Sequence, residues 1–335
     1  MKSRFLLWSL IALVVLLAIG ISLTIGWRPF IGPKARALTS LHFESTPQRL
    51  ERGRYLFTAL AGCSGCHSLH DWNTHGGPIL PNGEGVGQVM PFNTLPGRIV
   101  ASNITPDPET GAGKWTDDQL ARAIREGIGH DGRALFPMMP YQHLRHMSDE
   151  DLASVVIYMR TLVPVRHELP PTEIIFPVKY LIRNVPEPVT QPVSAPDRSD
   201  PVKSGEYLVT IASCIDCHSP QAKGEIPPGM EYSGGLTMEG PWGSVASANI
   251  TPDASGIGYY DEVLFIQAMR TGYVKARKLA SIMPFGEFKG LSDDDLRAMF
   301  AYLRTLKPVK HRVDNSLPPT YCKLCRLKHG GGDQN

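Results

Sequence analysis

Two copies of the pattern Cys-x-x-Cys-His carry the most specific chemistry in this sequence. The spacing places two thiols on one helical turn, where they can form thioethers with the two vinyl groups of a haem, and the histidine that follows can ligate the iron. The residues are Cys63, Cys66 and His67 in the first copy and Cys214, Cys217 and His218 in the second. The sequence therefore predicts two covalently bound haem c groups.

Paired cysteines also occur in zinc sites and in redox-active dithiols. In zinc sites the two pairs usually lie about 15–20 residues apart, whereas Cys66 and Cys214 are much further apart and each pair has its own histidine. A redox dithiol would need an alternating strand and helix context, which the hydrophobic pattern does not provide. Haem attachment is the interpretation that both copies favour.

An internal repeat surrounds these motifs. The segments that recur are Asn103–Asp107 as Asn249–Asp253, Ser148–Leu152 as Ser292–Leu296, and Arg160–Leu162 as Arg304–Leu306. Two long copies are too few for a solenoid, which needs at least three short units. Duplication of one domain explains the pattern better.

The elements that position the motifs are predicted to be helices. Thr116 to Gln119 has the pattern of a capping box, Ser148 and Ser292 each open an apolar helical pattern, and Thr46-Pro47 begins a helix that we expect to run into the first cysteine pair. Alternation with period two is short, so we expect few strands. The predicted fold class is mainly α.

The order of these motifs, twice along roughly residues 47 to 310, resembles the membrane-anchored di-haem cytochromes c that serve periplasmic alcohol and aldehyde dehydrogenases. The resemblance implies two tandem cytochrome c-type domains behind an N-terminal transmembrane helix. The expected segments are 1–27 as signal anchor, 28–46 as juxtamembrane linker, 47–165 as the first domain, 166–203 as a proline-rich linker, 204–310 as the second domain and 311–335 as the tail.

Methionine is the usual partner of histidine on cytochrome c iron. Met283-Pro284 precedes the Ser292 helix, and Met139-Pro140 precedes Ser148 by the same distance, so we predict Met139 and Met283 as the sixth ligands. Met138 would break this register, and Met90 has no equivalent in the second copy.

The first residues form an apolar segment from Phe5 to Trp27 that contains no charged side chain. A helix needs about 20 residues to cross a bilayer, and no Ala-x-Ala cleavage site follows, so we favour an uncleaved anchor over a cleaved signal. Basic residues on both sides leave the orientation open. The resemblance implies an inner-membrane protein whose haem domains face the periplasm.

Other candidate residues carry weaker signals. Trp115 aligns with Tyr260, which suggests an aromatic side chain near each haem edge or plain core packing. Five histidines of the first copy have no equivalent in the second and are interpreted as surface or loop residues: His70, His75, His130, His143 and His146. In the tail, Arg326 replaces the axial histidine after Cys322-x-x-Cys325, so a disulfide is expected there. The apolar segment Ile174–Val178 of the linker is expected to lie against a domain or to form a short strand.

Charge and motifs together favour an electron carrier. Lys plus Arg total 34 against 32 Asp plus Glu, so the balance does not suggest a nucleic-acid partner. A dehydrogenase subunit as donor and an oxidase or another cytochrome as acceptor are the expected partners. The alternative is a di-haem enzyme, a peroxidase or a small-substrate dehydrogenase, or else a haem-based sensor; each would need one iron with an open or labile position.

Overall fold

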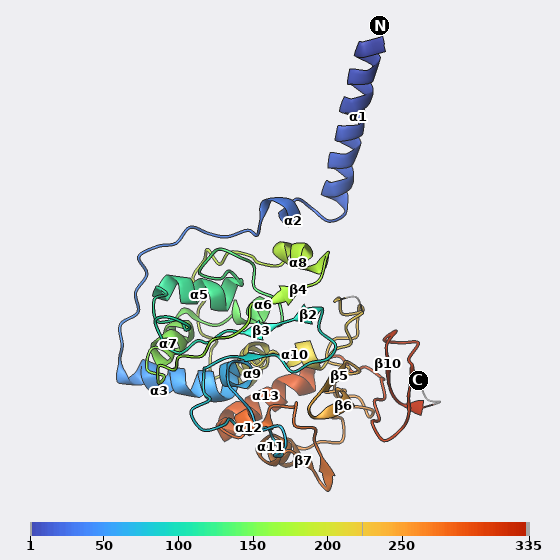
Figure 1. Ribbon diagram of the computed structural model, residues 1–335. Helices are drawn as coiled ribbons and strands as arrows, with labels where there is room; N and C mark the ends of the chain where they lie inside the picture. The colour runs from blue at the N-terminus through green and yellow to red at the C-terminus, as the bar shows by residue number, and fades with distance from the viewer. Residues whose placement is uncertain (1, 223, 333–335) are drawn as a thin grey trace.

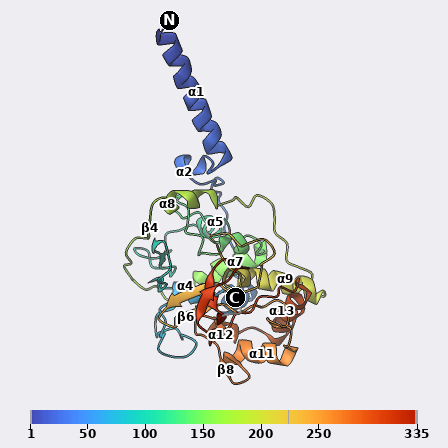
Figure 2. The same ribbon diagram turned by 90° about the vertical axis from the view of Figure 1, so that its right-hand side faces the viewer.

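The N-terminal helix stands away from a helical body in the computed structural model, which describes residues 2–222 and 224–332 (Figures 1 and 2). Helix α1 spans Lys2–Leu23, and its stretch Arg4–Leu23 is long and apolar enough to cross a membrane, with a mean hydropathy of 2.7. The helix ends four residues before the predicted boundary at Trp27, because the chain turns at Gly26 in the left-handed region, with φ of 69°.

Each copy of the repeat is built on three helices that surround an apolar core. In the first unit these are α3 (Pro47–Tyr55), α5 (Asp117–Glu126) and α7 (Asp149–Met159), and in the second unit α9 (Pro201–Ile211), α11 (Glu262–Thr271) and α13 (Asp293–Thr305). The predicted mainly helical class is confirmed for the described residues. The capping box on Thr116 and the caps on Ser148 and Ser292 form as predicted.

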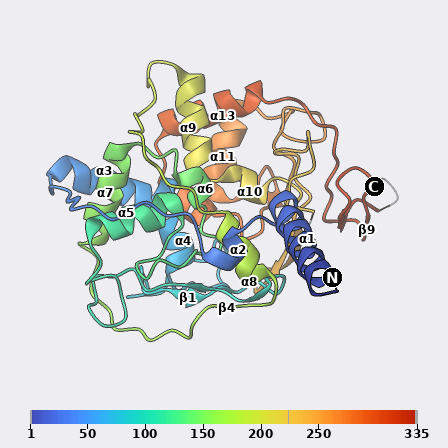
Figure 3. The same ribbon diagram turned by 90° about the horizontal axis from the view of Figure 1, so that it is seen from above.

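The first and last helices of each unit cross in close contact, α3 with α7 and α9 with α13 (Figure 3). Glycine makes this approach possible. A Cβ added at Gly53 would lie 1.9 Å from the Ser154 carbonyl oxygen, and one at Gly205 would lie 1.9 Å from the Ala298 carbonyl oxygen. The repeat thus preserves the crossing as well as the sequence pattern.

The remaining elements are short. The other helices are α2 (Arg28–Ile31), η1 (Leu56–Leu60), α4 (Cys63–His67), α6 (Tyr141–Leu144), α8 (Val178–Leu181), η2 (Ile182–Asn184), α10 (Cys214–Cys217) and α12 (Phe285–Phe288). The strands pair into two-stranded antiparallel sheets: β1 (Gln88–Val89) with β3 (Val100–Ala101), β2 (Gly97–Arg98) with β4 (Glu173–Ile174), β5 (Thr237–Gly240) with β6 (Gly243–Ala246), β7 (Tyr273–Val274) with β8 (Arg277–Lys278), and β9 (Pro319–Tyr321) with β10 (Lys328–Gly330).

One predicted helix is interrupted. The helix that begins at Thr46-Pro47 does not run unbroken into the first cysteine pair, because α3 passes into the π-helical turn η1 and then stops at Ala61. Gly62 takes a left-handed conformation, with φ of 60°, and α4 restarts in a new direction. The prediction of one continuous helix is wrong at this junction.

The apolar segment of the proline-rich linker is held to the first unit by its backbone. Strand β4 pairs with β2, as the short-strand interpretation expects, and the Ile175 amide donates to the Pro96 carbonyl oxygen at 3.0 Å. The side chains of Ile175 and Phe176 are exposed, so apolar packing does not hold the segment there. Further along, Arg183 donates to the Pro29 carbonyl oxygen at 2.8 Å and Asn184 donates to the Ile25 carbonyl oxygen at 2.9 Å. The linker therefore holds the chain at the base of α1.

The segment between α1 and the first unit also has fixed contacts. Arg36 forms ion pairs with Asp118 at 2.5 Å and with Glu126 at 2.7 Å, and both carboxylates are almost fully buried. The Thr39 amide donates to the same Asp118 carboxylate. This segment is thus docked on α5 and forms part of the folded body.

The two units meet through a tyrosine that completes a helix of the other unit. The Tyr55 hydroxyl, at the end of α3, accepts a hydrogen bond from the Ser292 amide at 3.1 Å and donates to the Asp295 carboxylate at 2.6 Å. Burial raises the pKa of Tyr55 to about 12, so the hydroxyl keeps the proton that it donates. Arg198 pairs with the same carboxylate at 2.7 Å.

The second unit returns the same contact. The Tyr207 hydroxyl, on α9, accepts from the Ser148 amide at 3.0 Å and donates to the Asp151 carboxylate at 2.7 Å, and Arg52 pairs with that carboxylate. Apolar residues of both units also belong to one continuous core. The two units therefore pack as one body, and each makes with the other the same tyrosine contact, as in an approximate two-fold symmetry.

We predict that Tyr55→Phe and Tyr207→Phe each lower the free energy of unfolding by about 1–3 kcal/mol, because each leaves a buried carboxylate and a helix amide without their shared partner. Chemical denaturation of the full chain measures this. Tyr321→Phe is the matched control: Tyr321 is 56% exposed, and its change should stay within about 0.5 kcal/mol. Equal small effects at all three tyrosines would contradict the interface described above.

Candidate haem sites

Each Cys-x-x-Cys motif lies on its own short helix that starts from a left-handed residue. Gly62 precedes α4 with φ of 60°, and Ser213 precedes α10 with φ of 53°. The turn brings the two thiols of each pair to one side of a single helical turn, as the spacing predicts. Glycine adopts this conformation without strain, whereas Ser213 is a non-glycine residue in a sparsely populated region.

The histidine that follows each pair is oriented by a backbone carbonyl. His67 donates from Nδ1 to the Ser102 carbonyl oxygen at 2.7 Å, and His218 donates from Nδ1 to the Ala248 carbonyl oxygen at 2.7 Å. With the proton fixed on Nδ1, each Nε2 carries the lone pair that a metal needs. Histidines that ligate metals commonly have such a partner on the second nitrogen.

The repeated segment Asn-Ile-Thr-Pro-Asp follows each of these carbonyls directly and holds it in place. Asn103 donates to the Val165 carbonyl oxygen at 2.8 Å and accepts from the Thr105 hydroxyl at 2.7 Å. Asn249 makes the same two bonds, to Val309 at 2.8 Å and from Thr251 at 2.8 Å. The repeated segment thus fixes the orientation of the histidine ring through the carbonyl that precedes it.

Met139 and Met283 occupy matching turns. Each methionine amide donates to the carbonyl three residues earlier, Phe136 or Ala280, at 3.0 Å. The prolines that follow have nearly equal backbone angles, φ −82° and ψ 45° at Pro140 against φ −79° and ψ 48° at Pro284. Both methionines pack against the core. This geometry aligns Met139, and not its neighbour Met138, with Met283.

Burial shifts the pKa values of the predicted ligands in a direction that suits metal binding. It lowers the pKa of His67 and of His218, which keeps both imidazoles neutral at neutral pH. It raises the pKa of Cys63 and of Cys214 to about 12. Redox-active cysteines need a lowered pKa, so these thiols do not have the properties of a redox dithiol.

The first unit reaches the second attachment helix across the contact between the units. His143, just after Met139, lies with Nε2 2.7 Å from an Asp216 carboxylate oxygen, inside the second Cys-x-x-Cys turn. Desolvation, the Asp216 carboxylate and then the Cys66 thiol of the other unit raise the pKa of the Cys217 thiol. The two haem-attachment motifs are therefore neighbours, although the sequence separates them widely.

Sequence reasoning does not anticipate this contact. The matching position after Met283 holds Glu287, whose carboxylate lies close to Gly65 of the first motif. The interpretation of His143 as a surface or loop residue is wrong, because it lies half-buried on α6 and its ring joins the two units. The repeat offset could have indicated it, since His143 and Glu287 stand at equal distances after the two methionines.

The other weak candidates have structural contacts. Trp115 packs at a tilt against His130, with 4.3 Å between ring centroids, and the ring of Tyr260 lies 4.8 Å from that of Tyr259. His75 packs 4.6 Å from Phe285 of the second unit, so it is an interface residue. His70 Nδ1 donates to the Gly77 carbonyl oxygen, His143 pairs with Asp216 as above, and His146 is exposed, as predicted.

The disulfide expected between Cys322 and Cys325 is not formed. Both cysteines are buried and carry separate thiols. The physical reason is that two histidines, His311 and His329, converge on the same point and bring their ring nitrogens to the thiols. The expectation of a simple crosslink in the tail is wrong.

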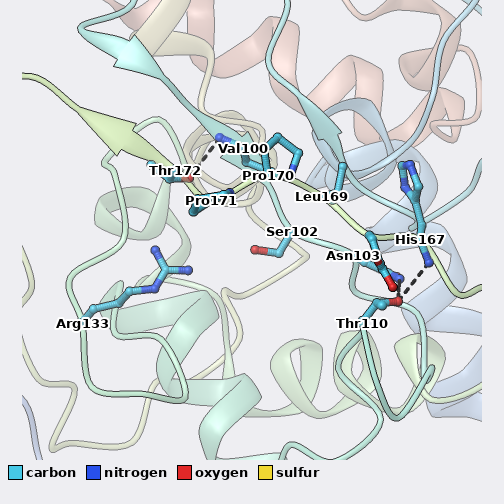
Figure 4. Close-up of a pocket in the computed structure, with 11 residues that line it drawn as sticks. Val100, Ser102, Asn103, Thr110, Arg133, His167, Leu169, Pro170, Pro171 and Thr172 are labelled. Atoms are coloured by element: carbon cyan, nitrogen blue, oxygen red, sulfur yellow. Dashed lines mark hydrogen bonds between the residues drawn. The ribbon is translucent and has the colours of Figure 1, made fainter.

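A pocket of about 380 Å³ lies between the first unit and the linker (Figure 4). Its lining includes Ser102, whose carbonyl orients His67, together with Arg133 and His167. None of the predicted haem residues, all of which the structure describes, lines this pocket. The pocket lies beside the loop whose Ser102 carbonyl accepts from the His67 ring, and it is not itself one of the candidate haem sites.

Comparison with known proteins supports the assignment of both units. The sequence profile of the Cytochrome c family matches residues 50–163 and again residues 202–307, together more than half of the chain. The di-haem cytochrome c-type protein of Cereibacter sphaeroides is 28% identical over 271 residues, which cover 77% of this chain and 86% of that protein.

Two further relatives are larger than this chain. The chain is 32% identical to a nicotinate dehydrogenase subunit of Pseudomonas putida over 275 residues, 77% of this chain and 21% of the relative. It is 32% identical to the fructose dehydrogenase cytochrome subunit of Gluconobacter japonicus over 272 residues, 77% of this chain and 52% of the relative. The chain thus spans about half or less of these two relatives. On the strength of both profile matches and both histidine–carbonyl pairs, this chain belongs to the cytochrome c family, whose members bind haem c covalently and transfer electrons.

Proposed function

We propose that this chain is a di-haem electron carrier built from two tandem cytochrome c domains, 47–165 and 204–310. The first haem is attached to Cys63 and Cys66, with His67 and Met139 as iron ligands. The second is attached to Cys214 and Cys217, with His218 and Met283 as iron ligands. The observation that carries the proposal is that both copies orient the histidine in the same way, through Nδ1 to a carbonyl 2.7 Å away.

The donor set fits haem c. Each unit offers two thiols on one turn, a neutral imidazole with Nε2 available, and a thioether on a matching turn. The first cysteine and the methionine of each set pack against the core. When bound, each haem supplies an iron that gains and loses one electron. The residues of the chain hold the group, exclude water from it and set its potential, which a methionine ligand raises.

The contact between the units supports electron transfer within the chain. Electron transfer slows steeply with distance, and α6, which follows the proposed ligand Met139, reaches the attachment helix α10 of the other unit through His143 and Asp216. The paired tyrosine contacts and the continuous core keep this arrangement rigid. A rigid pair of neighbouring sites makes a short path for electrons through the protein.

The relatives' names suggest the partners. Because several are cytochrome subunits of dehydrogenases, we infer that a dehydrogenase subunit donates electrons and that an oxidase or another cytochrome accepts them. We further infer that α1 stays in the inner membrane as a single anchor and that the haem domains face the periplasm. The hydrogen bonds from Arg183 and Asn184 to the base of α1 support a fixed stalk.

Covalent attachment predicts the mass of the unfolded protein. Intact-mass measurement under denaturing conditions should give the polypeptide plus two haems, because thioethers survive unfolding. Cys63→Ala and Cys214→Ala should each weaken one attachment, and Cys322→Ala should leave both. A mass with one haem or none in the unmodified protein would overturn the proposal.

Methionine ligation predicts the behaviour of the reduced protein with carbon monoxide. Two six-coordinate irons should bind little carbon monoxide, which absorbance spectra report. Met139→Ala and Met283→Ala should each open one iron to the gas and lower the potential of that haem, because the thioether favours the ferrous state.

Met138→Ala is the matched control, since it changes the neighbouring methionine and should leave the spectrum nearly unchanged. Stoichiometric carbon monoxide binding by the unmodified protein, or rapid turnover of peroxide, would favour a di-haem enzyme and contradict the carrier proposal. Retention of two haems in each variant shows that the result does not come from misfolding.

The anchor is tested by replacing residues 1–23, which end with α1, by a cleavable secretion signal. The di-haem protein should then appear in the soluble periplasmic fraction, while the unmodified chain stays in washed membranes with residues 1–23 present in its intact mass. A shortened mass of the natural protein would show that the segment is a cleaved signal.

A further inference from the structure

Four metal-binding side chains converge in the second unit at a place that the two haem sites do not use. They are His311, Cys322, Cys325 and His329, and their ligand atoms all lie within 4.8 Å of one another. Each residue is at most 2% exposed. The first comes from the segment after α13, and the other three come from the tail hairpin formed by β9 and β10.

The hydrogen bonds of the two histidines fix which nitrogen of each ring faces the cluster. His311 Nδ1 lies 2.9 Å from the Ser233 carbonyl oxygen, and His329 Nδ1 lies 2.9 Å from the Gly330 carbonyl oxygen. A carbonyl can only accept, so each Nδ1 donates and each ring turns its Nε2 toward the other, 3.0 Å away. Histidines that ligate metals commonly donate from the second nitrogen to such a carbonyl, and Nε2 is then the nitrogen that binds.

We propose that these four residues bind one zinc ion in a closed tetrahedral site. Zinc binds imidazole nitrogen at about 2.0–2.1 Å and thiolate sulfur at about 2.3 Å. At tetrahedral angles these lengths place two nitrogens about 3.3 Å apart and a nitrogen and a sulfur about 3.6 Å apart. The observed separations are 3.0 Å between His311 and His329 Nε2 and 3.5 Å between Cys322 Sγ and His311 Nε2.

The surrounding backbone is shaped for this cluster. The Cys322 amide donates to the Leu327 carbonyl oxygen at 2.8 Å and the Arg326 amide donates to the Cys322 carbonyl oxygen at 2.9 Å, which closes a tight turn around the two thiols. Gly235 lies against the rings: a Cβ there would be 2.8 Å from His311 Cε1 and 3.3 Å from His329 Cδ2. A side chain at this position would displace the rings.

The first unit shows what the histidine does without the tail. His167 occupies the place of His311: its amide donates to Thr110 Oγ1 as that of His311 donates to Ser255 Oγ, and its Nδ1 bonds the Val86 carbonyl oxygen at 2.9 Å. It lines the pocket in Figure 4. In both units this histidine therefore holds a loop through its Nδ1. Among the described residues, only the second unit adds a cluster of ligands around the Nε2 of that histidine.

Four protein ligands leave no position for substrate, so the site is structural. It fastens the tail hairpin to the loop behind the second haem motif, because His311 holds Ser233 and the next amide, Gly234, donates to the His218 carbonyl oxygen at 2.7 Å. The proposed zinc thus supports the chain segment that carries the second axial histidine.

The metal content of the full-length protein tests the proposal directly. Protein purified in detergent and passed over a chelating resin should contain one zinc for every two irons by elemental mass spectrometry, with copper absent. On denaturation in the presence of a zinc-sensitive dye, it should release that zinc and expose two free thiols. This measurement needs no variant and no knowledge of the redox partners.

Variants assign the metal to the cluster. Cys322→Ser with Cys325→Ser, and separately His329→Asn, should lose the zinc and keep both irons, and tryptic cleavage of the tail should become faster. His167→Asn is the matched control, because it changes the equivalent histidine and should keep the zinc. The iron content shows that each variant has folded and matured.

Three results would overturn the proposal. One is a Cys322–Cys325 disulfide in zinc-free protein, a second is zinc that remains in both cluster variants, and a third is copper in place of zinc. These results are independent of the carrier proposal. If that proposal failed, the iron content would change; if the zinc proposal failed, the zinc content would change.

Discussion

A tyrosine hydroxyl shared between the two halves of the protein holds the arrangement together. Tyr55 reaches the first amide and the buried carboxylate at the start of α13, and Tyr207 does the same at the start of α7. Each half therefore adds a hydrogen bond to the cap residue of a helix in the other half, whose own serine caps that helix. Because the exchange is reciprocal, the halves cannot slide past each other without breaking the hydrogen bonds to two cap amides and two buried carboxylates.

This constraint decides how the redox sites meet. With α7 and α13 fixed by the opposite unit, the short helices α6 and α12 that follow Met139 and Met283 are held against α9 and η1, the segments that precede the attachment helices of the other unit. His143 on α6 also reaches Asp216 on α10 itself. The symmetry is approximate, since His143 meets Asp216 on one side whereas Glu287 lies near Gly65 on the other. These charged groups differ between the sites, which gives the two sites different electrostatic surroundings despite equal proposed ligand sets.

Local patterns in the sequence were enough to predict the residues proposed for each site. Each cysteine pair lies within a few residues of the histidine that follows it, and each helix cap lies within a few residues of the helix that it begins, so a helical pattern alone places these side chains relative to one another. The repeat distinguishes Met139 from Met138, because Met139 precedes Ser148 by the same number of residues as Met283 precedes Ser292. Insertions between the copies lie in other loops and leave this spacing unchanged. The apolar run that forms α1 could also be recognised from the sequence, because its length and composition predict the helix without any partner within the protein.

The tertiary structure alone decided what depends on residues far apart in the chain. The tail motif at Cys322 suggested a disulfide because sequence spacing shows two thiols and cannot show that His311 and His329 close around them. The reciprocal tyrosine contacts were equally invisible, since a tyrosine on a helix has no local sign that its hydroxyl will cap another helix. Packing brings such groups together through the core, and their chemistry is set by neighbours that the linear order does not record.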